Sequence, residues 1–431
     1  MKKRMIMLAG VMAVSTLAGC SKAPEKPAGR VSGNETTAEY TTAEQTSVEP
    51  TTAEPGTQEE ETTMSRTEYP VVEEPEVKAK SNFDAVAKIM DKLATEKEGE
   101  NLLFSPMSFD IAMAMCANGA NDDVKKEFEE YSGVSMEEYN EFIRYYIAGA
   151  GEIMDIANSI WIRDSYNILD NYKANMEKYY FAECESRVFD ERFVEEVNSW
   201  CAEKTRGMID KIIDKVPAPE TAAKLINALY FNGDWETQFE ETAVRDTEFT
   251  LFDGSQVTFD GMYSSEDIYL ENDVATGFMK CYKNTRYAFV GILPKEQGEF
   301  NLEELDIEGL LESETKTDVV ICMPKIEYDT TMDLKQMLEV AGLDGAADYD
   351  AFNGIVNDYL TITDIIQKTV IKINETGTEA AAVTAVNMEF ECVMVPSVPK
   401  EVYLDRPYAF LIYDRENDVI LFAGKVANPV K

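Results

Sequence analysis

The sequence predicts a mixed α+β domain, in which helices pack on mostly antiparallel sheets, within a chain of 431 residues. Three observations predict this class: helical spacing of apolar residues early in the domain, strand-like apolar runs late in it, and turns with glycine or aspartate between the runs. Repeated βαβ units would instead alternate the two patterns along the chain. A content of 45% hydrophobic and 28% charged residues allows a full buried core under a water-exposed surface.

The amino terminus has the pattern of a targeting segment. Lys2, Lys3 and Arg4 precede an apolar stretch that is too short to be a stable membrane span and that ends in Leu17-Ala18-Gly19-Cys20. This ending resembles a bacterial lipobox, whose cysteine is acylated, so we expect residues 1–20 to be a lipoprotein signal peptide and Cys20 to carry the lipid anchor. We therefore expect the protein outside the cytoplasm, anchored to the bacterial cell membrane. The alternative is an ordinary secretory signal with a chance cysteine, which would give a secreted protein.

Residues 21–80 have the composition of a disordered tether. They repeat Thr-Thr-Ala-Glu, contain no Leu, Ile or Phe, and carry 13 glutamates against six basic residues, a net charge of −7. Such a segment cannot form a core, and its like charges and prolines keep it extended. A folded repeat array is the alternative, but the repeats lack an apolar face to stack. The folded domain is expected over residues 81–431.

The charge of this domain restricts its partners. Residues 81–431 hold 31 basic and 68 acidic side chains, so repulsion argues against nucleic acid and the net charge of −37 favours basic partners. The chain contains no histidine, which removes Ser-His-Asp and Cys-His catalysis and HExxH zinc sites. We expect no enzyme activity, no metal and no cofactor. Six cysteines follow Cys20 without a CxxC pair, and most are expected to be buried thiols.

Helices open the domain. Phe83, Val86, Met90 and Leu93 recur at three- and four-residue spacing until Gly99 interrupts the run. A second helix follows residues 101–106, and further helices are expected as far as about residue 213.

Strands dominate after that point. Apolar and β-branched runs bounded by turns predict strands at residues 225–231, 248–251, 288–293, 318–324, 369–374, 408–413 and 419–426.

A long segment between two of these strands, residues 374–406, does not fit an ordinary turn. Loops of this length are usually functional or disordered, and its first part, residues 375–385, is composed of small and β-permissive residues. As a helix it would use its alanines well. As a strand it would present Thr378, Ala380, Ala382 and Thr384 on one face. A segment able to do either is suited to a conformational switch.

These residues resemble the hinge of the reactive loop of a known family, the serpins, and the likeness extends over nearly all of residues 82–431. The other motifs that resemble the family occur in its order: Asn101 to Ser108, Ala157-Asn158-Ser159-Ile160-Trp161, Asn198-Ser199-Trp200 with Glu203 to Ile209, Leu225 to Trp235, Asp405-Arg406-Pro407-Tyr408, and Gly424 to Pro429. The resemblance implies a serpin fold, with helices packed on three mostly antiparallel β-sheets and an exposed reactive loop.

The resemblance also implies a suicide-substrate inhibitor of extracellular serine proteases. In the family, a protease cuts the loop, and the freed hinge enters the central sheet as a new strand and traps the acyl-enzyme. About 15 inserted residues, at roughly 3.3 Å each, would carry the protease some 50 Å. Hinge side chains must enter without strain or buried charge. The hinge residues that the resemblance assigns are Glu375, Gly377, Thr378, Glu379, Ala380, Ala381, Ala382 and Thr384.

Supporting residues can be assigned by the same resemblance. Ser105, Ser108 and Asn227 match a polar cluster beneath the opening of the sheet, and Gln367 stands where the family usually has histidine. Glutamine both donates and accepts hydrogen bonds but does not titrate, so the departure puts pH-tuned opening in doubt more than inhibition.

Three further positions match the top of the sheet and the core. Lys325 and Glu375 match an ion pair, and Trp235 matches the aromatic residue beside it. Without the resemblance they would be an exposed ion pair worth under about 1 kcal/mol and a core tryptophan. Tyr408 replaces the usual phenylalanine, which the core should tolerate if the hydroxyl finds a partner.

The scissile bond is placed by counting. Roughly 17 loop residues from Glu375 give Glu391 as the cleaved residue, followed by Cys392. Because the loop is longer than in compact relatives, Val393 and Met394 are alternatives. Cleavage at Glu391 implies a Glu-specific protease, whereas the alternatives suit elastase-, chymotrypsin- or subtilisin-like enzymes. A reactive thiol at Cys392 lacks a cation to activate it.

Two function classes remain open from the sequence. The first is the protease inhibitor, and the second is a non-inhibitory surface binding protein that keeps the fold without the trap. We expect a monomer, a protease as partner of the inhibitor, and no nucleic acid.

Overall fold

The computed structural model describes residues 69–97, 99–150, 153–298, 300–348, 351–356, 358, 365–378 and 398–430. These residues all belong to one compact unit, Thr63–Lys431, and the chain's other unit is Met1–Thr62. The predicted signal peptide, nearly all of the predicted tether, and residues 379–397 of the predicted reactive loop lie outside the described residues.

Helices begin the unit as predicted, and local sequence explains where they start. The side chains of Asn82, Asn121, Ser135 and Asp190 accept hydrogen bonds from the first turns of their helices, and Ser105 does so immediately before a proline. The helices are α1 (Phe83–Glu96), α2 (Pro106–Asn118), α3 (Asp122–Ser132), α4 (Met136–Ala148), α5 (Asp170–Tyr180), α6 (Glu191–Lys204), α7 (Ile307–Glu312) and α8 (Met337–Val340).

The largest sheet has nine strands in the order β1-β16-β15-β9-β8-β7-β10-β14, with β6 paired to β7. Its pairs are antiparallel except β10 with β14. The strands are β1 (Leu102–Phe104), β6 (Val244–Thr250), β7 (Gln256–Glu271), β8 (Ala275–Cys281), β9 (Tyr287–Pro294), β10 (Thr315–Pro324), β14 (Lys400–Tyr403), β15 (Tyr408–Asp414) and β16 (Val419–Val426).

Two smaller sheets meet side by side. One has the order β3-β2-β4, and the other has the order β11-β12-β13-β5. They are joined by a parallel bridge between Leu225 and Ile365, and β5 follows β4 directly in the chain. The strands are β2 (Met154–Arg163), β3 (Glu183–Arg187), β4 (Ala223–Phe231), β5 (Gly233–Asp234), β11 (Ile326–Asp333), β12 (Ile366–Ile373) and β13 (Gly377–Thr378).

This architecture confirms the predicted fold class of helices on three mostly antiparallel sheets. The separation of early helices from late strands is less complete than the sequence suggested. Strands β1, β2 and β3 lie among the early helices, and α7 and α8 lie among the late strands. The last two helices are too short to leave a helical period in the sequence.

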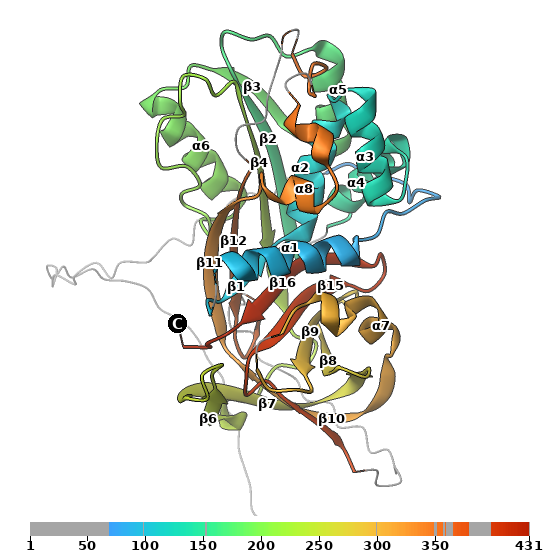
Figure 1. The fold of residues 1–431 in the computed structure, drawn as a ribbon, viewed down its shortest axis with the longest axis vertical. Coiled ribbons are helices and arrows are strands. Elements are labelled where there is room, and N and C mark those ends of the chain that lie inside the picture. Colours follow the sequence, from blue (N-terminus) through green and yellow to red (C-terminus); the bar gives the residue numbers. More distant parts are fainter. Residues whose placement is uncertain are drawn as a thin grey trace, which may run out of the picture. The chain divides into compact units, whose positions relative to one another are not determined.

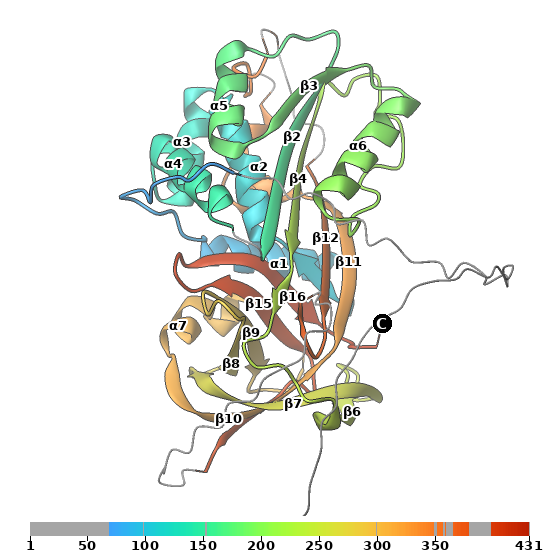
Figure 2. The ribbon, with the colours of Figure 1, turned by 180° about the vertical axis from the view of Figure 1, so that it is seen from behind.

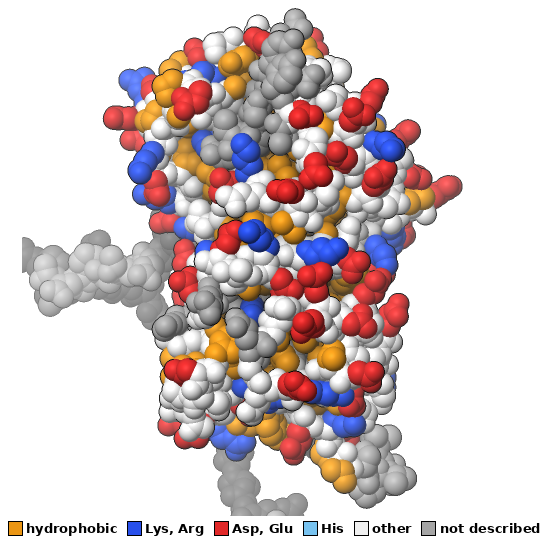
Figure 3. All heavy atoms as spheres, viewed as in Figure 1, with side chains coloured by type: hydrophobic (Ala, Val, Ile, Leu, Met, Phe, Trp, Pro, Cys, Tyr) orange, Lys and Arg blue, Asp and Glu red, His pale blue; other side chains and the backbone are white. Residues whose placement is uncertain are grey.

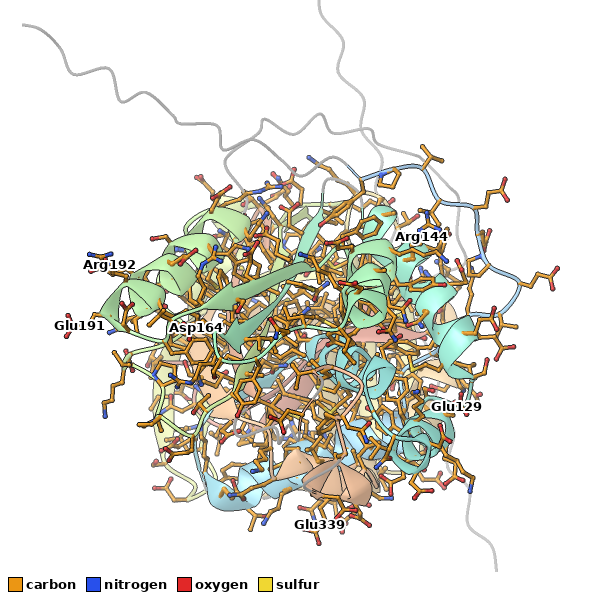
Figure 4. The ribbon with its side chains drawn as sticks, turned by 90° about the horizontal axis from the view of Figure 1, so that it is seen from above. Glu129, Arg144, Asp164, Glu191, Arg192 and Glu339 are labelled. Carbon is orange, nitrogen blue, oxygen red and sulfur yellow. The ribbon has the colours of Figure 1, made fainter. Side chains whose placement is uncertain are left out.

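Helices α2 and α6 lie on opposite sides of strands β2 and β4 (Figure 1 and Figure 2). Phe193, Val197 and Trp200 of α6 pack with Ile226 and Ala228 of β4 in a small cluster of their own. The opposite face of the strand belongs to the main core, together with α2. The charged side chains of Glu191 and Arg192, at the start of α6, project away from the sheets (Figure 4).

The described part of the chain holds five free thiols, of which Cys116, Cys184, Cys201 and Cys322 are buried and Cys281 is half-buried. Burial raises the pKa of Cys116 and of Cys201 to about 12, so these thiols stay protonated. Within the same described residues, no helix has the length and apolar character needed to cross a membrane.

The segment before α1 is attached to the sheet. Tyr69 packs against Phe181, with ring centroids 4.8 Å apart, and its hydroxyl donates a hydrogen bond to the carbonyl of Ile156 on β2 (2.9 Å). Further along, the backbone N–H of Ser81 donates to Asp418 at the start of β16 (3.0 Å).

Candidate functional site at the junction of the two small sheets

Strands β4 and β12 run parallel as neighbours but are joined only near their two ends. The Leu225–Ile365 bridge closes one end, and at the other end β13 lies between β12 and β5, the short strand that follows β4. Both strands are fully described, and no further backbone pairing joins them among the described residues. We call this unpaired stretch, between residues 227–231 of β4 and 367–371 of β12, the slot. Its backbone groups are arranged to accept another strand.

The first residues of the predicted hinge already lie in the sheet. Thr378 pairs with Ile373 of β12 on one side and with Gly233 of β5 on the other, and Gly377 pairs with Asp234. A Cβ atom at Gly377 would lie 2.2 Å from the carbonyl oxygen of Gly233, so only glycine allows this approach. Strand β13 therefore marks the entrance of the slot.

A polar network lies beneath the slot, where the resemblance placed it. The backbone N–H of Ser105 donates to Oε1 of Gln367 (2.9 Å), and Nε2 of Gln367 donates back to the carbonyl of Ser105 (2.8 Å). Both side chains are buried. The start of α2 is thereby fixed to β12 by a pair of reciprocal hydrogen bonds.

The network continues to the strand on the other side of the slot. The hydroxyl of Ser108 donates to Oδ1 of Asn227 on β4, and Nδ2 of Asn227 donates to Oδ1 of Asn158 on β2 (2.6 Å). Thr369 donates to the same oxygen of Gln367 that Ser105 uses (3.2 Å). The structure therefore brings Ser105, Ser108, Asn227 and Gln367 together, although sequence reasoning did not single out Asn158 or Thr369 for this network.

Trp235 holds the chain that leads into β13. Its indole N–H donates to the carbonyl of Asn374 (2.9 Å), and its backbone N–H donates to the carbonyl of Thr376 (3.0 Å). The N–H of Phe239 donates to the carbonyl of Glu375 (2.9 Å). Residues 235–239 and the start of the hinge therefore form one hydrogen-bonded unit, with the Trp235 side chain fully buried.

Lys325 and Glu375 form the predicted ion pair, with 2.6 Å between Nζ and Oε1. Burial is the largest single influence on the pKa of Glu375 and acts to raise it. The hydrogen bond from Lys325, a hydrogen bond from the backbone and the charge of Lys325 together outweigh burial, so the pKa is lowered from its ordinary value. The lysine side chain is 40% exposed, so solvent screens the pair and its contribution to stability is small.

Two residues that sequence reasoning missed lie beside Trp235. Lys280 on β8 is 1% exposed, and its Nζ donates to Glu266 (2.6 Å) and to the carbonyl of Thr237 (2.8 Å). Tyr282 is fully buried, and its hydroxyl lies 2.6 Å from Oγ1 of Thr378. A lysine within the apolar run of residues 278–282 was the available signal, because lysine is almost never buried without a partner.

The hydroxyl of Tyr408 has no hydrogen-bond partner among the described residues, and the side chain is fully buried. The prediction that the core tolerates tyrosine at this position depends on such a partner, and none is found among the described residues. The pKa of Tyr408 is raised well above 10 by burial, so the group stays neutral.

Several predicted site residues lie outside the described residues: Glu379, Ala380, Ala381, Ala382, Thr384, Glu391, Cys392, Val393, Met394 and Cys20. No cluster of three His, Cys, Asp or Glu side chains that could hold a metal occurs in the part of the chain that the structure describes.

Comparison with known proteins gives one consistent match. The family described as "Serpin (serine protease inhibitor)" matches residues 80–429. An uncharacterized serpin-like protein of Thermococcus kodakarensis is 30% identical over 381 residues, which covers 84% of this chain and 88% of that protein. The native state of Tengpin, a thermophilic serpin, has a TM-score of 0.72 at 31% identity and covers 81% of this chain and 93% of that one. Human thyroxine-binding globulin has a TM-score of 0.71 at 25% identity, with coverage of 81% and 97%.

Proposed function

This chain belongs to the serpin family, and on that premise we propose that it is a suicide-substrate inhibitor of extracellular serine proteases. The observation that carries the proposal is the slot, which is held at its ends, unpaired along its middle, and already bordered at one end by Gly377 and Thr378 of the predicted hinge. Inhibition then requires that cleavage free the hinge residues after Thr378, so that they can insert between β12 and β4.

The register of β13 specifies where the following residues would go. Thr378 lies opposite Ile373 and Gly233, and the pairing is antiparallel on both sides. Each advance of two residues along the loop therefore moves two residues back along β12 and β4. Continued insertion would place Ala380 between Ile371 and Phe231, Ala382 between Thr369 and Leu229, and Thr384 between Gln367 and Asn227.

The side chains at these positions suit the slot. Ile371, Thr369 and Gln367 are all buried on one face of β12, so residues opposite them would be buried as well. Alanine adds little volume there, and Thr384 would bring a hydroxyl to the polar network around Gln367. Glu379 would point to the other face and would not have to bury its charge beside that network.

The protease supplies the chemistry in this proposal. Its nucleophile attacks the loop at Glu391, or alternatively at Val393 or Met394, and insertion displaces the acyl-enzyme before water releases it. The inhibitor needs no catalytic residue of its own, so the absence of histidine is no obstacle.

The setting of the inhibitor is part of the same proposal. A lipid on Cys20 and the part of the predicted tether that precedes Tyr69 would hold the domain outside a bacterial cell membrane as a monomer, whereas residues 69–80 of the predicted tether are attached to the domain. Acidic side chains are spread over the face seen in Figure 3. A net charge of −37 on residues 81–431 should speed encounter with basic proteases and make that rate fall with salt.

A panel of Glu-specific, elastase-like, chymotrypsin-like and subtilisin-like proteases tests the proposal. We expect at least one to form a complex that survives SDS, and mass spectrometry of the released peptide identifies the cut. Finding only cleaved protein beside fully active protease would reject inhibition.

The hinge variants Thr378→Arg and Thr378→Ser make the test specific. Thr378 is 1% exposed, so arginine would place a charge inside the sheet and should convert the inhibitor into a substrate. Serine keeps the size and the hydroxyl, and it should leave inhibition intact.

The second candidate is a non-inhibitory binding protein with the same fold. The similarity to thyroxine-binding globulin favours keeping it, because that protein's name states a binding role. The two candidates differ in stored energy: an inhibitor nicked in its loop should melt at a higher temperature than the intact protein, whereas a binder without the trap should not.

A further inference from the structure

The side chain of Tyr282 lies directly against Thr378, the second residue of β13. Tyr282 follows β8 and forms a backbone bridge with Trp235. Its hydroxyl oxygen is 2.6 Å from Oγ1 of Thr378, and both side chains are buried. This is a contact between residues 96 positions apart, and it joins the nine-stranded sheet region to β13.

The ring of Tyr282 has little freedom to turn away. It stacks on Trp235, with centroids 4.5 Å apart and planes at 18°, and it meets Phe231 edge to face at 5.0 Å. On the side of Gly233 the fit is so close that a Cβ atom there would lie 2.7 Å from the tyrosine ring. The hydroxyl is therefore held at the entrance of the slot whether or not Thr378 occupies it.

Lys280 contacts the residues that surround Tyr282. Its ammonium group bonds to the carbonyl of Thr237, lies 4.3 Å from the ring centre of Phe239 and 5.5 Å from that of Trp235, and is paired with Glu266. Lys280 thus contacts three of the residues 235–239 that bond to the start of the hinge. Burial lowers the pKa of Lys280, although Glu266 opposes the shift.

If Thr378 left the sheet, the hydroxyl of Tyr282 would lose its hydrogen bond to Thr378. Thr378 is its hydrogen-bond partner, and a buried hydroxyl without a partner is unfavourable. The pKa of Tyr282 is raised by burial, so the group is a neutral donor or acceptor at any physiological pH. The entrance of the slot therefore favours a hydroxyl-bearing residue at position 378 inside the sheet.

We propose that Tyr282 is a positioning residue for strand insertion, whose hydroxyl holds Thr378 in the slot before cleavage and sets the register in which the hinge enters. The proposal rests on the inhibitory function proposed above. In the intact protein, Gly377 and Thr378 of the hinge are already paired in the sheet as β13. Cleavage would therefore lengthen β13 instead of forming a new strand.

We call the hydrogen bond between the hydroxyls of Tyr282 and Thr378 the latch. Hydrogen exchange of the intact protein tests the latch without any protease. In Tyr282→Phe, the peptide that contains Gly377 and Thr378 should exchange about threefold to tenfold faster, as expected for loss of one hydrogen bond. A peptide from β15 serves as the control for general destabilisation and should not change. Unchanged exchange at the hinge would overturn the proposal.

Substitutions at the other end of the bond complete the test. In Thr378→Val, the peptide that contains position 378 should exchange as fast as it does in Tyr282→Phe. The double variant should exchange no faster than either single variant, and Thr378→Ser should exchange at the wild-type rate. A serine variant that behaves like the valine variant would also overturn the latch. If Tyr282→Phe does not fold, the comparison of valine with serine decides alone.

A protease assay then separates this proposal from the function on which it rests. Among proteases that the wild type traps, Tyr282→Phe should require more inhibitor molecules per protease, because more hinges are released as substrate. If the hinge exchange responds but the wild type traps no protease, the latch stands and the inhibitory function fails. If the wild type inhibits and neither readout changes in Tyr282→Phe, the latch fails.

Discussion

Replacing Gln367 by methionine isolates the contribution of the polar network beneath the slot. Methionine has nearly the shape of glutamine but forms none of its hydrogen bonds, so the change removes polarity without opening a large cavity. Gln367 accepts from the N–H of Ser105 and the hydroxyl of Thr369, and it donates to the carbonyl of Ser105. All three residues are buried.

The magnitude follows from the groups that lose a partner. The N–H of Ser105 would be left buried without a partner, at about 1–3 kcal/mol, whereas its carbonyl keeps the hydrogen bond from the N–H of Phe109 (3.1 Å) and loses only a second one, at about 0.5–1.5 kcal/mol. The hydroxyl of Thr369 loses its acceptor, at a further roughly 0.5–1.5 kcal/mol. Burial of the thioether returns roughly 1 kcal/mol. We therefore expect Gln367→Met to lower the free energy of unfolding of the native state by about 1–5 kcal/mol.

The assay is urea unfolding of the intact protein, followed at its first transition. Lys372→Met is the matched control, because it introduces the same side chain on the same strand at an exposed position. The control should stay within about 0.5 kcal/mol of the wild type. A Gln367→Met variant as stable as this control would show that the network contributes nothing to the closed sheet.

Three further predictions concern other parts of the domain. Tyr408→Phe should raise the free energy of unfolding by about 1 kcal/mol, because the buried hydroxyl has no partner among the described residues, and a loss of stability in urea would contradict this. Burial raises the pKa of Asp110 to about 7, against a lowering by the hydrogen bond from Tyr131. The folded state therefore holds this proton more tightly than the unfolded state, so the contribution of Asp110 to stability is fully present below about pH 4 and is lost as the pH rises through about 7. Asp110→Asn should remove that part of the pH dependence of unfolding, and parallel curves for the variant and the wild type would count against it. Lys325→Ala should cost under about 1 kcal/mol, with the difference from wild type disappearing in 1 M salt; a larger loss that persists in salt would mean that the ion pair is not the reason.

Local signals in the sequence were sufficient for much of the fold. The spacing of Phe83, Val86, Met90 and Leu93 predicts α1, and the apolar runs at 408–413 and 419–426 predict β15 and β16. Ser105 and Pro106 give both a helix start and, through the family resemblance, a member of the polar network. These features depend on neighbours in the chain or on recurrent motifs, so they can be read without coordinates.

The missed parts depend on contacts between distant segments. Nothing near Tyr282 in the sequence indicates that its hydroxyl meets residue 378, and nothing near Glu266 indicates that it pairs with a buried lysine. The pairing of β13 with both β12 and β5 was likewise not predictable, because two residues are too few to show a strand period. The sequence predicts a hinge but does not indicate that two of its residues, Gly377 and Thr378, pair with β12 and β5.

The contact between Gly377 and Gly233 limits how the segment that follows it can be replaced. The two backbones are in contact there, with no room for a methyl group. A transplanted loop with a residue other than glycine at position 377 would therefore clash with Gly233. Grafts should therefore be spliced after Thr378 and rejoined before Lys400, where β14 resumes. Between these two points the segment can be exchanged while β12, β13 and β5 keep their own residues.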